Sequence, residues 1–335
     1  MPSIYTLISE TGINKLLANL NPHKTCGPDN INGRVLKELK DQIAPILTEI
    51  LKKSLETGET PKDWKHANVA PAFKKGEKYK PVNYRPISLT CICCKLMEHI
   101  ITSNHKILYN LQHGFRKARS CETQLIDFIQ ELTKSNNCSK QTDLIIMDFA
   151  KAFDKVPLCR LLYKLKFYGI QKDILNWIKA FLSDRTQTVF INGTSSTSVP
   201  VTSGVPQGTV LGPILFLIYI NDLPEYLKYS KLRLFADDSI IHREIKSHQD
   251  CQKLQHDLDA AAQWESDWLM AFYPDKCTKL SISQKKNTIN HDYILQNHTL
   301  ESVSSAKYLG NYNRISNGTN TLTILHQMGT NHWAF

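Results

Sequence analysis

The chain has 335 residues, and 41% of them are hydrophobic, so it can form a sizeable core with two or three subdomains. Its 41 Lys and Arg residues outnumber its 31 Asp and Glu residues, which gives a net charge of +10. This excess suits a polyanionic partner such as RNA or DNA, although an ordinary basic protein also shows it. The longest apolar run, 214–220, is far shorter than the ~20 residues of a membrane helix, so no membrane partner is expected.

Nine cysteines are scattered along the chain, and the N-terminus lacks a basic region followed by a long apolar run. We therefore expect reduced thiols in an intracellular protein that is not secreted, either nuclear or cytoplasmic. Cys91 and Cys94 have the spacing of zinc ligands, and Cys93 lies between them. No second cysteine pair matches them, so the sequence predicts small buried residues in a helical stretch over 91–101.

The N-terminal part of the chain is expected to be largely helical, because its apolar residues recur at helical spacing. A first helix is predicted over 6–20, and a turn follows at 27–30. Residues 34–58 are predicted to form one or two helices, interrupted near Pro45. Segment 62–90 is expected to be irregular, with short strands.

Strands and helices alternate in the rest of the chain, which predicts an α+β fold with a mostly antiparallel sheet. The expected elements are a strand ending at Asp148, a helix over 172–184, a strand over 186–193, a helix beginning at Pro213, a hairpin around 234–238, an amphipathic helix with Leu254, Leu258, Ala261, Trp268 and Leu269 on one face, and a strand over 278–283.

Two adjacent carboxylates, Asp237 and Asp238, lie between the strand-like runs KLRLF and SII, which places them at the tip of a hairpin. Adjacent like charges at a tight turn repel, and folding does not require them. Asp148, at the end of another apolar strand, supplies a third carboxylate. Such a set is typical of a divalent-cation site, whereas a solvated turn is the alternative for an isolated Asp-Asp pair.

Several sequence blocks carry a resemblance to a known family. They are GPDNI (27–31), NYRPISL (83–89), QHGFRKARS (112–120), MDFAKAFDKVP (147–157), YGI (168–170), INGTSS (191–196), SGVPQGTVLGPILFLIYINDLP (203–224), LFADD (234–238), KC (276–277) and KYLG (307–310). In this order they resemble the reverse transcriptase domain of a non-LTR (LINE-type) retrotransposon of the Jockey-like kind. The resemblance covers roughly residues 5–310, and the block around Gln207 is its most specific part.

The resemblance implies a right-hand polymerase fold with fingers and a palm, in which the thumb is missing or degenerate. The corresponding parts are a helical N-terminal extension over 1–80, fingers over 81–139, a palm with the catalytic carboxylates over 140–283, the end of the palm as a strand pair over 284–310, and an unmatched tail over 311–335. Disorder is one interpretation of that tail.

The activity that the resemblance implies is RNA-directed DNA synthesis, in which a primer 3′-hydroxyl is extended with dNTPs. Two Mg²⁺ ions, or Mn²⁺ in their place, would be bridged by Asp148 and Asp237, with Asp238 assisting. The implied partners are an RNA template, a DNA primer and dNTPs, and the oligomeric state stays open.

The resemblance also implies roles for residues around the incoming nucleotide. Phe153 would lie against the sugar and exclude a 2′-hydroxyl, the alternative being a core phenylalanine. Gln207 and Gly208 would lie beside the template base and the nucleotide, the alternative being a simple strand–helix turn.

Basic residues complete the implied site, although a solvated surface charge is the alternative for each of them. Arg85 matches the arginine that clamps the triphosphate, and Lys74 or Lys75 would add a second contact. Lys276 matches the lysine that protonates pyrophosphate, but Tyr273 departs from the asparagine usual before it. The residues expected to face template phosphates are Arg116, Lys117 and Arg119.

Three departures from the family pattern point to a truncated polymerase. Only 22 residues separate Leu89 from Gln112, where relatives carry about one more helix. Nothing after Gly310 matches a thumb, and we expect no endonuclease domain, which in the family usually comes first. The alternative function is therefore a relic that binds nucleic acid without extending a primer. An RNA-directed RNA polymerase and a group II intron maturase are further alternatives, which the SGVPQG and LFADD blocks and the lack of a maturase X-domain pattern disfavour.

Overall fold

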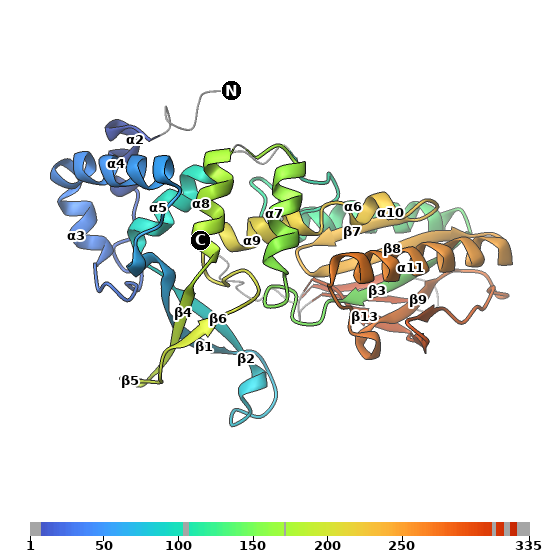
Figure 1. Cartoon of the computed structure of the whole chain (residues 1–335). Coiled ribbons are helices and arrows are strands. Elements are labelled where there is room, and N and C mark those ends of the chain that lie inside the picture. The colour runs from blue at the N-terminus through green and yellow to red at the C-terminus, as the bar shows by residue number, and fades with distance from the viewer. Residues whose placement is uncertain (1–7, 103–106, 171, 310–312, 318–321, 327–335) are drawn as a thin grey trace. The chain divides into compact units, whose positions relative to one another are not determined.

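The computed structural model describes residues 8–102, 107–170, 172–309, 313–317 and 322–326 (Figure 1). The chain divides into two compact units, and each is built from two stretches of sequence. The first unit contains residues 1–106 and 156–216, and the second contains residues 107–155 and 217–335. No helix in the described part of the chain is long and apolar enough to cross a membrane.

The first unit begins with three helices, α2 (Glu10–Ala18), α3 (Gly33–Glu38) and α4 (Lys40–Thr57). Helix α2 packs on α4, whose buried residues Leu51 and Leu55 recur at helical spacing. The helical character predicted for this part is confirmed.

The predicted interruption near Pro45 is wrong, because the chain breaks at Leu39 and Pro45 lies inside α4. A proline at this position removes one intrahelical hydrogen bond. The buried face of α4 outweighs that loss, since Ala44 and Leu47 on either side of the proline are both in the core. Gly58, with a φ of +67°, ends the helix.

Helix α5 (Ile92–Ile101) contains the clustered cysteines, and Cys91, Cys93 and Cys94 are buried, as predicted. The remaining helices of the first unit are α7 (Leu158–Phe167), α8 (Lys172–Leu182) and the beginning of α9 (Leu211–Tyr219). The predicted start of α9 at Pro213 is two residues late. A helix tolerates proline in its first turn, because the first N–H groups have no intrahelical acceptor.

The sheet of the first unit contains β1 (His66–Phe73), β2 (Tyr84–Leu89), β4 (Arg185–Ile191), β5 (Thr194–Ser195) and β6 (Val199–Val201). Strand β1 pairs antiparallel with β2 and parallel with β4, and β4 also pairs with β5 and β6. Short 3-10 turns, η1 (Lys62–Lys65) and η2 (Pro81–Asn83), precede β1 and β2.

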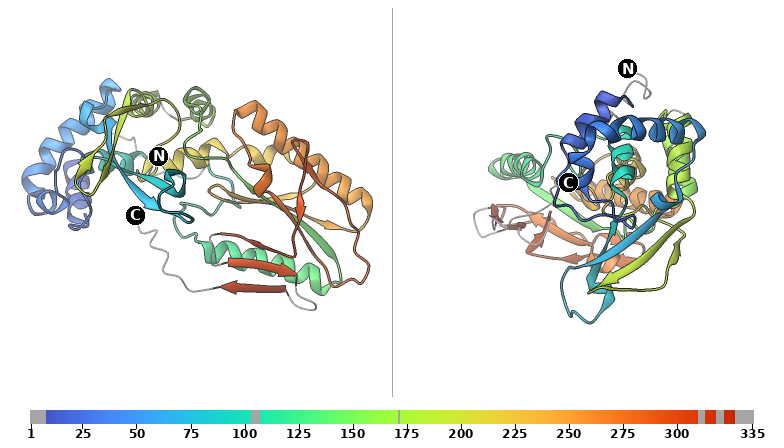
Figure 2. Two further views of the ribbon diagram at one scale, coloured as in Figure 1. Left: turned by 90° about the horizontal axis from the view of Figure 1, so that it is seen from below. Right: turned by 90° about the vertical axis from the view of Figure 1, so that its left-hand side faces the viewer.

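The second unit is built on a five-stranded sheet in the order β12-β9-β3-β8-β7 (Figure 2). Its strands are β3 (Gln141–Asp148), β7 (Lys231–Phe235), β8 (Asp238–Ile245), β9 (Thr278–Ile282) and β12 (Glu301–Ser302). All neighbouring pairs are antiparallel except β12 with β9. This sheet is therefore mostly antiparallel.

Figure 2 shows α6 (Cys121–Asn137) and α11 (His248–Trp268) on opposite faces of this sheet. Phe128 of α6 packs in a core cluster with Leu144, Ile240 and Leu280 of the three central strands. The short helix α10 (Leu223–Tyr226) contacts α11.

The predicted buried face of α11 is right for Leu254, Leu258 and Ala261 but wrong at its end. Leu269 is 59% exposed, because it caps the helix in a left-handed conformation and its side chain leaves the helical face. Trp264 is buried in that region, and Trp268 is only half-buried.

The C-terminal part of the second unit consists of short strands. They are β10 (Ile294–Leu295), β11 (His298–Thr299), β13 (Ser305–Lys307), β14 (Asn313–Asn317) and β15 (Leu322–His326), and the 3-10 turn η3 (Pro274–Lys276) precedes β9. Strands β13, β14 and β15 form an antiparallel sheet. The rest of the tail that was predicted over 311–335, at 311–312, 318–321 and 327–335, lies outside the described residues.

Candidate active site

A hairpin of the second unit carries the paired carboxylates where the sequence placed them. Strands β7 and β8 are joined by Ala236 and Asp237, with Phe235 paired to Asp238. Buried leucine and isoleucine residues anchor both strands, whereas Asp237 is half-buried and Asp238 is exposed. The fold thus buries the apolar strands and leaves the acidic groups at the tip in reach of solvent.

Asp148, the last residue of β3, lies directly opposite Asp238 in the strand register. Leu144, Ile145 and Met147 of β3 are buried, so the strand itself is held by the core. Like charges opposite each other destabilise an antiparallel pair. The positions of the three predicted carboxylates are therefore adjacent in the sheet, at a cost to its stability.

Among the residues that the structure describes, no group of three or more His, Cys, Asp and Glu side chains is placed to hold a metal ion. The Oδ2 atom of Asp148 instead lies 3.4 Å from Nζ of Lys276. The backbone thus brings the predicted acids together, and one of them is paired with a predicted site lysine.

Lys276 is placed by the turn η3, which is attached to β3. The Tyr273 N–H donates to the Asp148 carbonyl at 2.8 Å, and the Lys276 N–H donates to the Tyr273 carbonyl at 2.9 Å. The Lys276 ammonium also lies 4.3 Å from the ring centre of Tyr273. Its side chain is 56% exposed, so the pair with Asp148 contributes at most about 1 kcal/mol to stability.

Phe153 is half-buried in the turn after β3. Its ring lies edge-on to that of Phe115, with the ring centres 6.3 Å apart. The turn is joined to the segment after α11 by the Ala150 N–H, which donates to the Ala271 carbonyl at 2.7 Å. Partial exposure and an aromatic neighbour are compatible with both predicted interpretations of Phe153.

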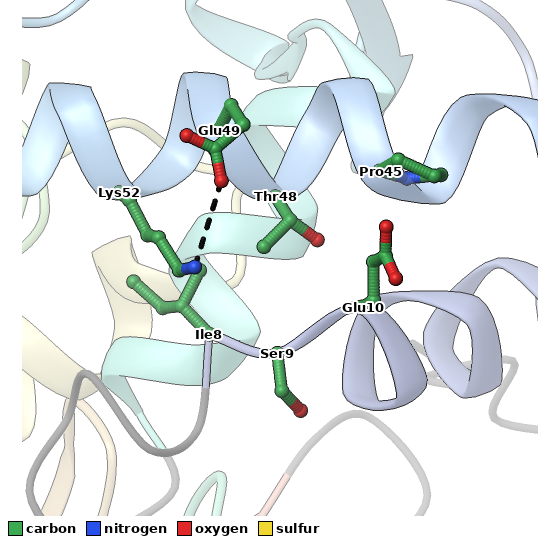
Figure 3. A pocket seen from close by; sticks show the side chains of 7 residues that line it. All are labelled: Ile8, Ser9, Glu10, Pro45, Thr48, Glu49 and Lys52. Atoms are coloured by element: carbon green, nitrogen blue, oxygen red, sulfur yellow. Dashed lines mark ion pairs between the residues drawn. The ribbon is translucent and has the colours of Figure 1, made fainter.

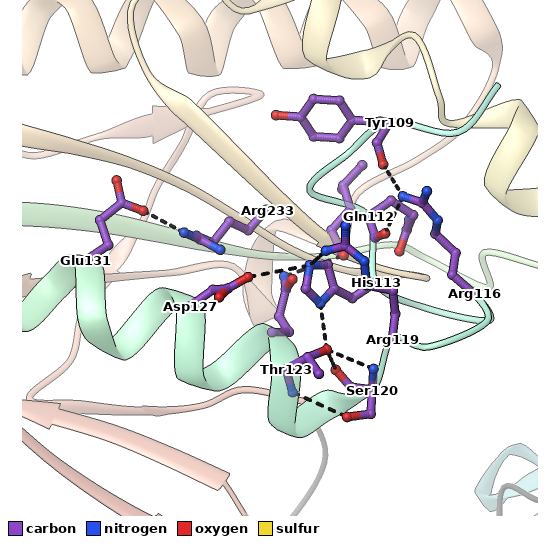
Figure 4. Close-up of polar contacts among 12 residues, drawn as sticks. Tyr109, Gln112, His113, Arg116, Arg119, Ser120, Thr123, Asp127, Glu131 and Arg233 are labelled. Carbon is purple, nitrogen blue, oxygen red and sulfur yellow. Dashed lines mark hydrogen bonds and ion pairs between the residues drawn. The ribbon is translucent and has the colours of Figure 1, made fainter. Parts of the chain in front are cut away.

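The loop before α6 contains the cations expected to face the template (Figure 4). Arg116 Nη1 donates to the carbonyl oxygens of Tyr109 at 2.8 Å and Gln112 at 3.1 Å, so this guanidinium holds its own loop. Lys117 and Arg119 are exposed. Arg119 Nη1 also donates to Nε2 of His113 at 2.5 Å. The three predicted cations therefore differ, because Arg116 and Arg119 bond within the loop whereas Lys117 reaches solvent.

His113 in the same loop is buried, and its Nδ1 atom lies 3.0 Å from Oγ1 of Thr123 in α6. Burial and the neighbouring Arg119 guanidinium lower the pKa of His113 to about 4. Ser120 and Thr123 form a capping box at the start of α6, which fixes where the loop ends (Figure 4).

Four predicted nucleotide-binding residues belong to the first unit. The Gln207 carbonyl accepts a hydrogen bond from the Ser88 N–H of β2 at 2.7 Å. Gly208 has a φ of +93°, and a Cβ atom on it would lie 2.8 Å from the Ser88 oxygen. The loop is therefore packed on β2, the strand that carries exposed Arg85, while Lys74 is exposed just after β1.

Two residues with clear structural roles were missed in the sequence. Buried Glu98 accepts a hydrogen bond from the Leu211 N–H at 2.7 Å and so caps α9, and burial raises its pKa. Buried Gln112 contacts the turn of the carboxylate hairpin. Both contacts join segments more than 100 residues apart, so no local pattern could have indicated them.

A pocket of about 460 Å³ lies between α2 and α4 in the first unit (Figure 3). It is lined by Ile8, Ser9, Glu10, Pro45, Thr48, Glu49 and Lys52. None of the predicted site residues lines it.

Comparison with known proteins adds two kinds of match. The family model described as "Reverse transcriptase (RNA-dependent DNA polymerase)" matches residues 73–312. The RNA-directed DNA polymerase from mobile element jockey of Drosophila melanogaster is 29% identical over 315 residues, which cover 89% of this chain and 34% of that relative. The probable RNA-directed DNA polymerase from transposon BS of the same species is 28% identical, covering 86% and 33%. The chain thus spans about one third of the length of these curated relatives.

Proposed function

Because this chain belongs to the reverse transcriptase family and is similar to Jockey-type retrotransposon polymerases, we propose that it is an RNA-directed DNA polymerase domain. It would extend the 3′-hydroxyl of a DNA primer along an RNA template with dNTPs. The observation that carries the proposal is the register of Asp148 opposite Asp238, with Asp237 in the adjoining turn. We assign the extension to 1–80, the fingers to 81–139 and the palm to 140–283, with its end at 284–310.

The acidic groups fit the divalent metal ions that this family generally uses, because carboxylate oxygens are the ligands that Mg²⁺ prefers. Asp148, Asp237 and Asp238 would hold two such ions, and Mn²⁺ would serve in their place. Bound there, the metal would neutralise phosphate charge and make the primer hydroxyl more acidic. The register that sets Asp148 opposite Asp238 supports this assignment, since a bound cation would offset the repulsion that two facing carboxylates exert on each other.

Lys276 is proposed to supply the proton that pyrophosphate takes up as it leaves. Support comes from its position 3.4 Å from Asp148 and from its exposure, which leaves the ammonium in reach of a substrate. Tyr273 holds this lysine by its ring and its backbone, although the family usually has asparagine there.

The other predicted residues would recognise the substrates. Arg85 and Lys74 would bind the triphosphate, because both are exposed cations at neighbouring strand ends. Gln207 and Gly208 would shape the site of the new base pair, and Phe153 would exclude a 2′-hydroxyl. Template phosphates would be bound by Lys117 and Arg119, with Arg116 holding the loop.

A second candidate function is nucleic-acid binding without synthesis. The side-chain positions favour it, since within the described residues no three His, Cys, Asp or Glu side chains are placed to hold a metal ion. The short spacer between Leu89 and Gln112 favours it as well.

Primer extension by the purified chain on poly(rA)/oligo(dT) with Mg²⁺ tests the proposal. Asp237→Ala should lower the rate by about 100-fold or more, because it removes a group that stabilises the reacting charges. Asp259→Ala removes an exposed acid of α11 in the same unit and should extend as the wild type does. If the wild type does not extend but binds RNA in a salt-sensitive way, the second candidate replaces the first.

A further inference from the structure

A segment distant in sequence runs beside the carboxylate hairpin. The Leu234 N–H donates to the Leu111 carbonyl at 3.1 Å, and the His113 N–H donates to the Leu234 carbonyl at 3.0 Å. Gln112 thereby forms a parallel bridge with Leu234 of β7, which is otherwise the edge strand of the sheet. This bridge sets the side chain of Gln112 beside the turn.

The carboxamide of Gln112 is used on that turn. Its Oε1 atom accepts hydrogen bonds from the backbone N–H of Ala236 at 3.0 Å and of Gly114 at 2.8 Å. Gln112 is 1% exposed, so both bonds are shielded from water. Because both partners are donors, only the oxygen can face them, and the amide has one possible orientation.

Ala236 needs such support because of its backbone conformation. Its φ is +52°, in the left-handed region that residues with a Cβ atom avoid. It is the first residue of a two-residue hairpin turn, where glycine is usual if φ is positive. A strained backbone conformation persists only where its surroundings stabilise it. Here the stabilising contact is the hydrogen bond from the Ala236 N–H to the carboxamide oxygen of Gln112.

Gly114 lets the two segments approach this closely. A Cβ atom on Gly114 would lie 2.4 Å from the Ala236 nitrogen, closer than such atoms are ever found. The turn that contains Asp237 is therefore held in place by close backbone packing against Gly114 and by a hydrogen bond to the side chain of Gln112.

We propose that Gln112 is a positioning residue, whose carboxamide oxygen fixes the turn at Ala236 so that Asp237 and Asp238 are presented with Asp148 to a divalent cation. The cation part of this inference rests on the proposed function. The part that concerns the conformation of the turn rests on the hydrogen bonds of Gln112 alone.

Three variants of the full chain separate positioning from general stability. Gln112→Met keeps the length of the side chain and removes the acceptor, whereas Gln112→Glu keeps an acceptor oxygen. Gln124→Met is the matched control: Gln124 is a fully buried glutamine of the same unit whose amide donates to the Tyr308 hydroxyl at 2.8 Å and to the Leu234 carbonyl at 3.5 Å, so it removes a buried amide near the hairpin and keeps the acceptor of the Ala236 N–H.

The hydrogen-exchange rate of the Ala236 amide, measured by NMR, reports directly on its hydrogen bond to Gln112. Gln112→Met should accelerate this exchange roughly tenfold or more, because a buried donor loses its acceptor. Gln112→Glu and Gln124→Met should leave it slow. If Gln112→Met does not fold, Gln112→Asn, whose oxygen is one methylene short of the turn, takes its place in the comparison.

Titration with Mn²⁺ alone, monitored through the EPR signal of the free ion, measures how tightly the carboxylates bind a divalent cation and does not depend on catalysis. Gln112→Met should bind Mn²⁺ roughly tenfold more weakly than Gln124→Met, and Gln112→Glu should not be weakened. Unchanged Mn²⁺ affinity in Gln112→Met overturns the positioning role, whether or not exchange is faster. A wild type that binds no Mn²⁺ overturns the proposed metal site itself, and the exchange experiment then still decides whether Gln112 holds the turn.

Discussion

The ring of Phe153 is the residue for which two interpretations make the clearest opposing predictions. It lies half-buried five positions after Asp148, edge-on to Phe115. If it only packs, its removal lowers the free energy of unfolding and nothing else. If it lies against the nucleotide sugar, its removal changes which nucleotide is accepted.

We expect Phe153→Val to raise ribonucleotide incorporation about tenfold relative to deoxynucleotide incorporation, because the smaller side chain leaves room for the 2′-hydroxyl. Steric discrimination of this size is worth about 1–3 kcal/mol, as for one methylene group in a binding pocket. The measurement is the ratio of kcat/KM for dTTP and UTP on the same primed template. Phe115→Val is the control, since it removes the packing partner and leaves the Phe153 ring. A lowered Tm with an unchanged ratio would falsify the gate and leave a core phenylalanine.

The loop that leads into α9 is attached to β2 through backbone contacts, and Gly208 makes this attachment possible. Its positive φ and its distance to Ser88 both exclude a side chain. The loop and the strand that carries Arg85 therefore form one structural element of the first unit, although more than 100 residues separate them.

We expect Gly208→Ala to destabilise the first unit by about 1–3 kcal/mol more than Gly193→Ala does, because the new methyl group would be forced against β2. Gly193 is the matched control, since its φ is +82° and no atom lies within 4 Å of a Cβ built there. It should show only the conformational cost of about 1–2 kcal/mol. Urea unfolding of both variants gives the comparison, and equal losses would contradict the close approach of the loop to β2.

Elements with a strong local pattern were predictable from the sequence. The strand ending at Asp148, the helix now bounded as α8 and the hairpin at 234–238 all follow from their apolar spacing. The errors at Pro45 and Pro213 arose because helices tolerate proline where burial or a helix start compensates for it. The hydrogen bond from Ala236 to Gln112 could not be predicted from the sequence, since it depends on tertiary contacts alone.

Buried histidines link the stability of the second unit to pH. His242 on β8 is 4% exposed, and burial, with the positive charges of Arg233 and Lys231, lowers its pKa to about 4 despite nearby Glu131. His113 has its pKa lowered to about 4 as well. Between pH 6.5 and 4 the unfolded chain binds protons that the folded chain does not, so stability is lost as the pH falls through that window.

Between pH 7 and pH 5 the free energy of unfolding should fall by about 2 kcal/mol less in His242→Phe than in the wild type. The reason is that the substitution removes a group that binds a proton in the unfolded chain but not in the folded chain. Urea midpoints at the two pH values measure this loss. His113→Phe should show a similar reduction, because the pKa of His113 is also lowered to about 4. A full wild-type loss in His242→Phe would mean that the histidine is already charged in the folded protein.

The way in which the two units share the chain also bears on its synthesis. Strand β3 is the centre of the second unit's sheet, but its partners β8 and β9 begin 90 and 130 residues after Asp148. A ribosome that adds about 5–20 residues per second would leave the apolar segment of β3 without its partners for roughly 5–25 s. The central strand of the acidic site is thus open to aggregation or to chaperone binding during that interval, and slowing translation between Asp148 and Asp238 should lower the yield of folded protein.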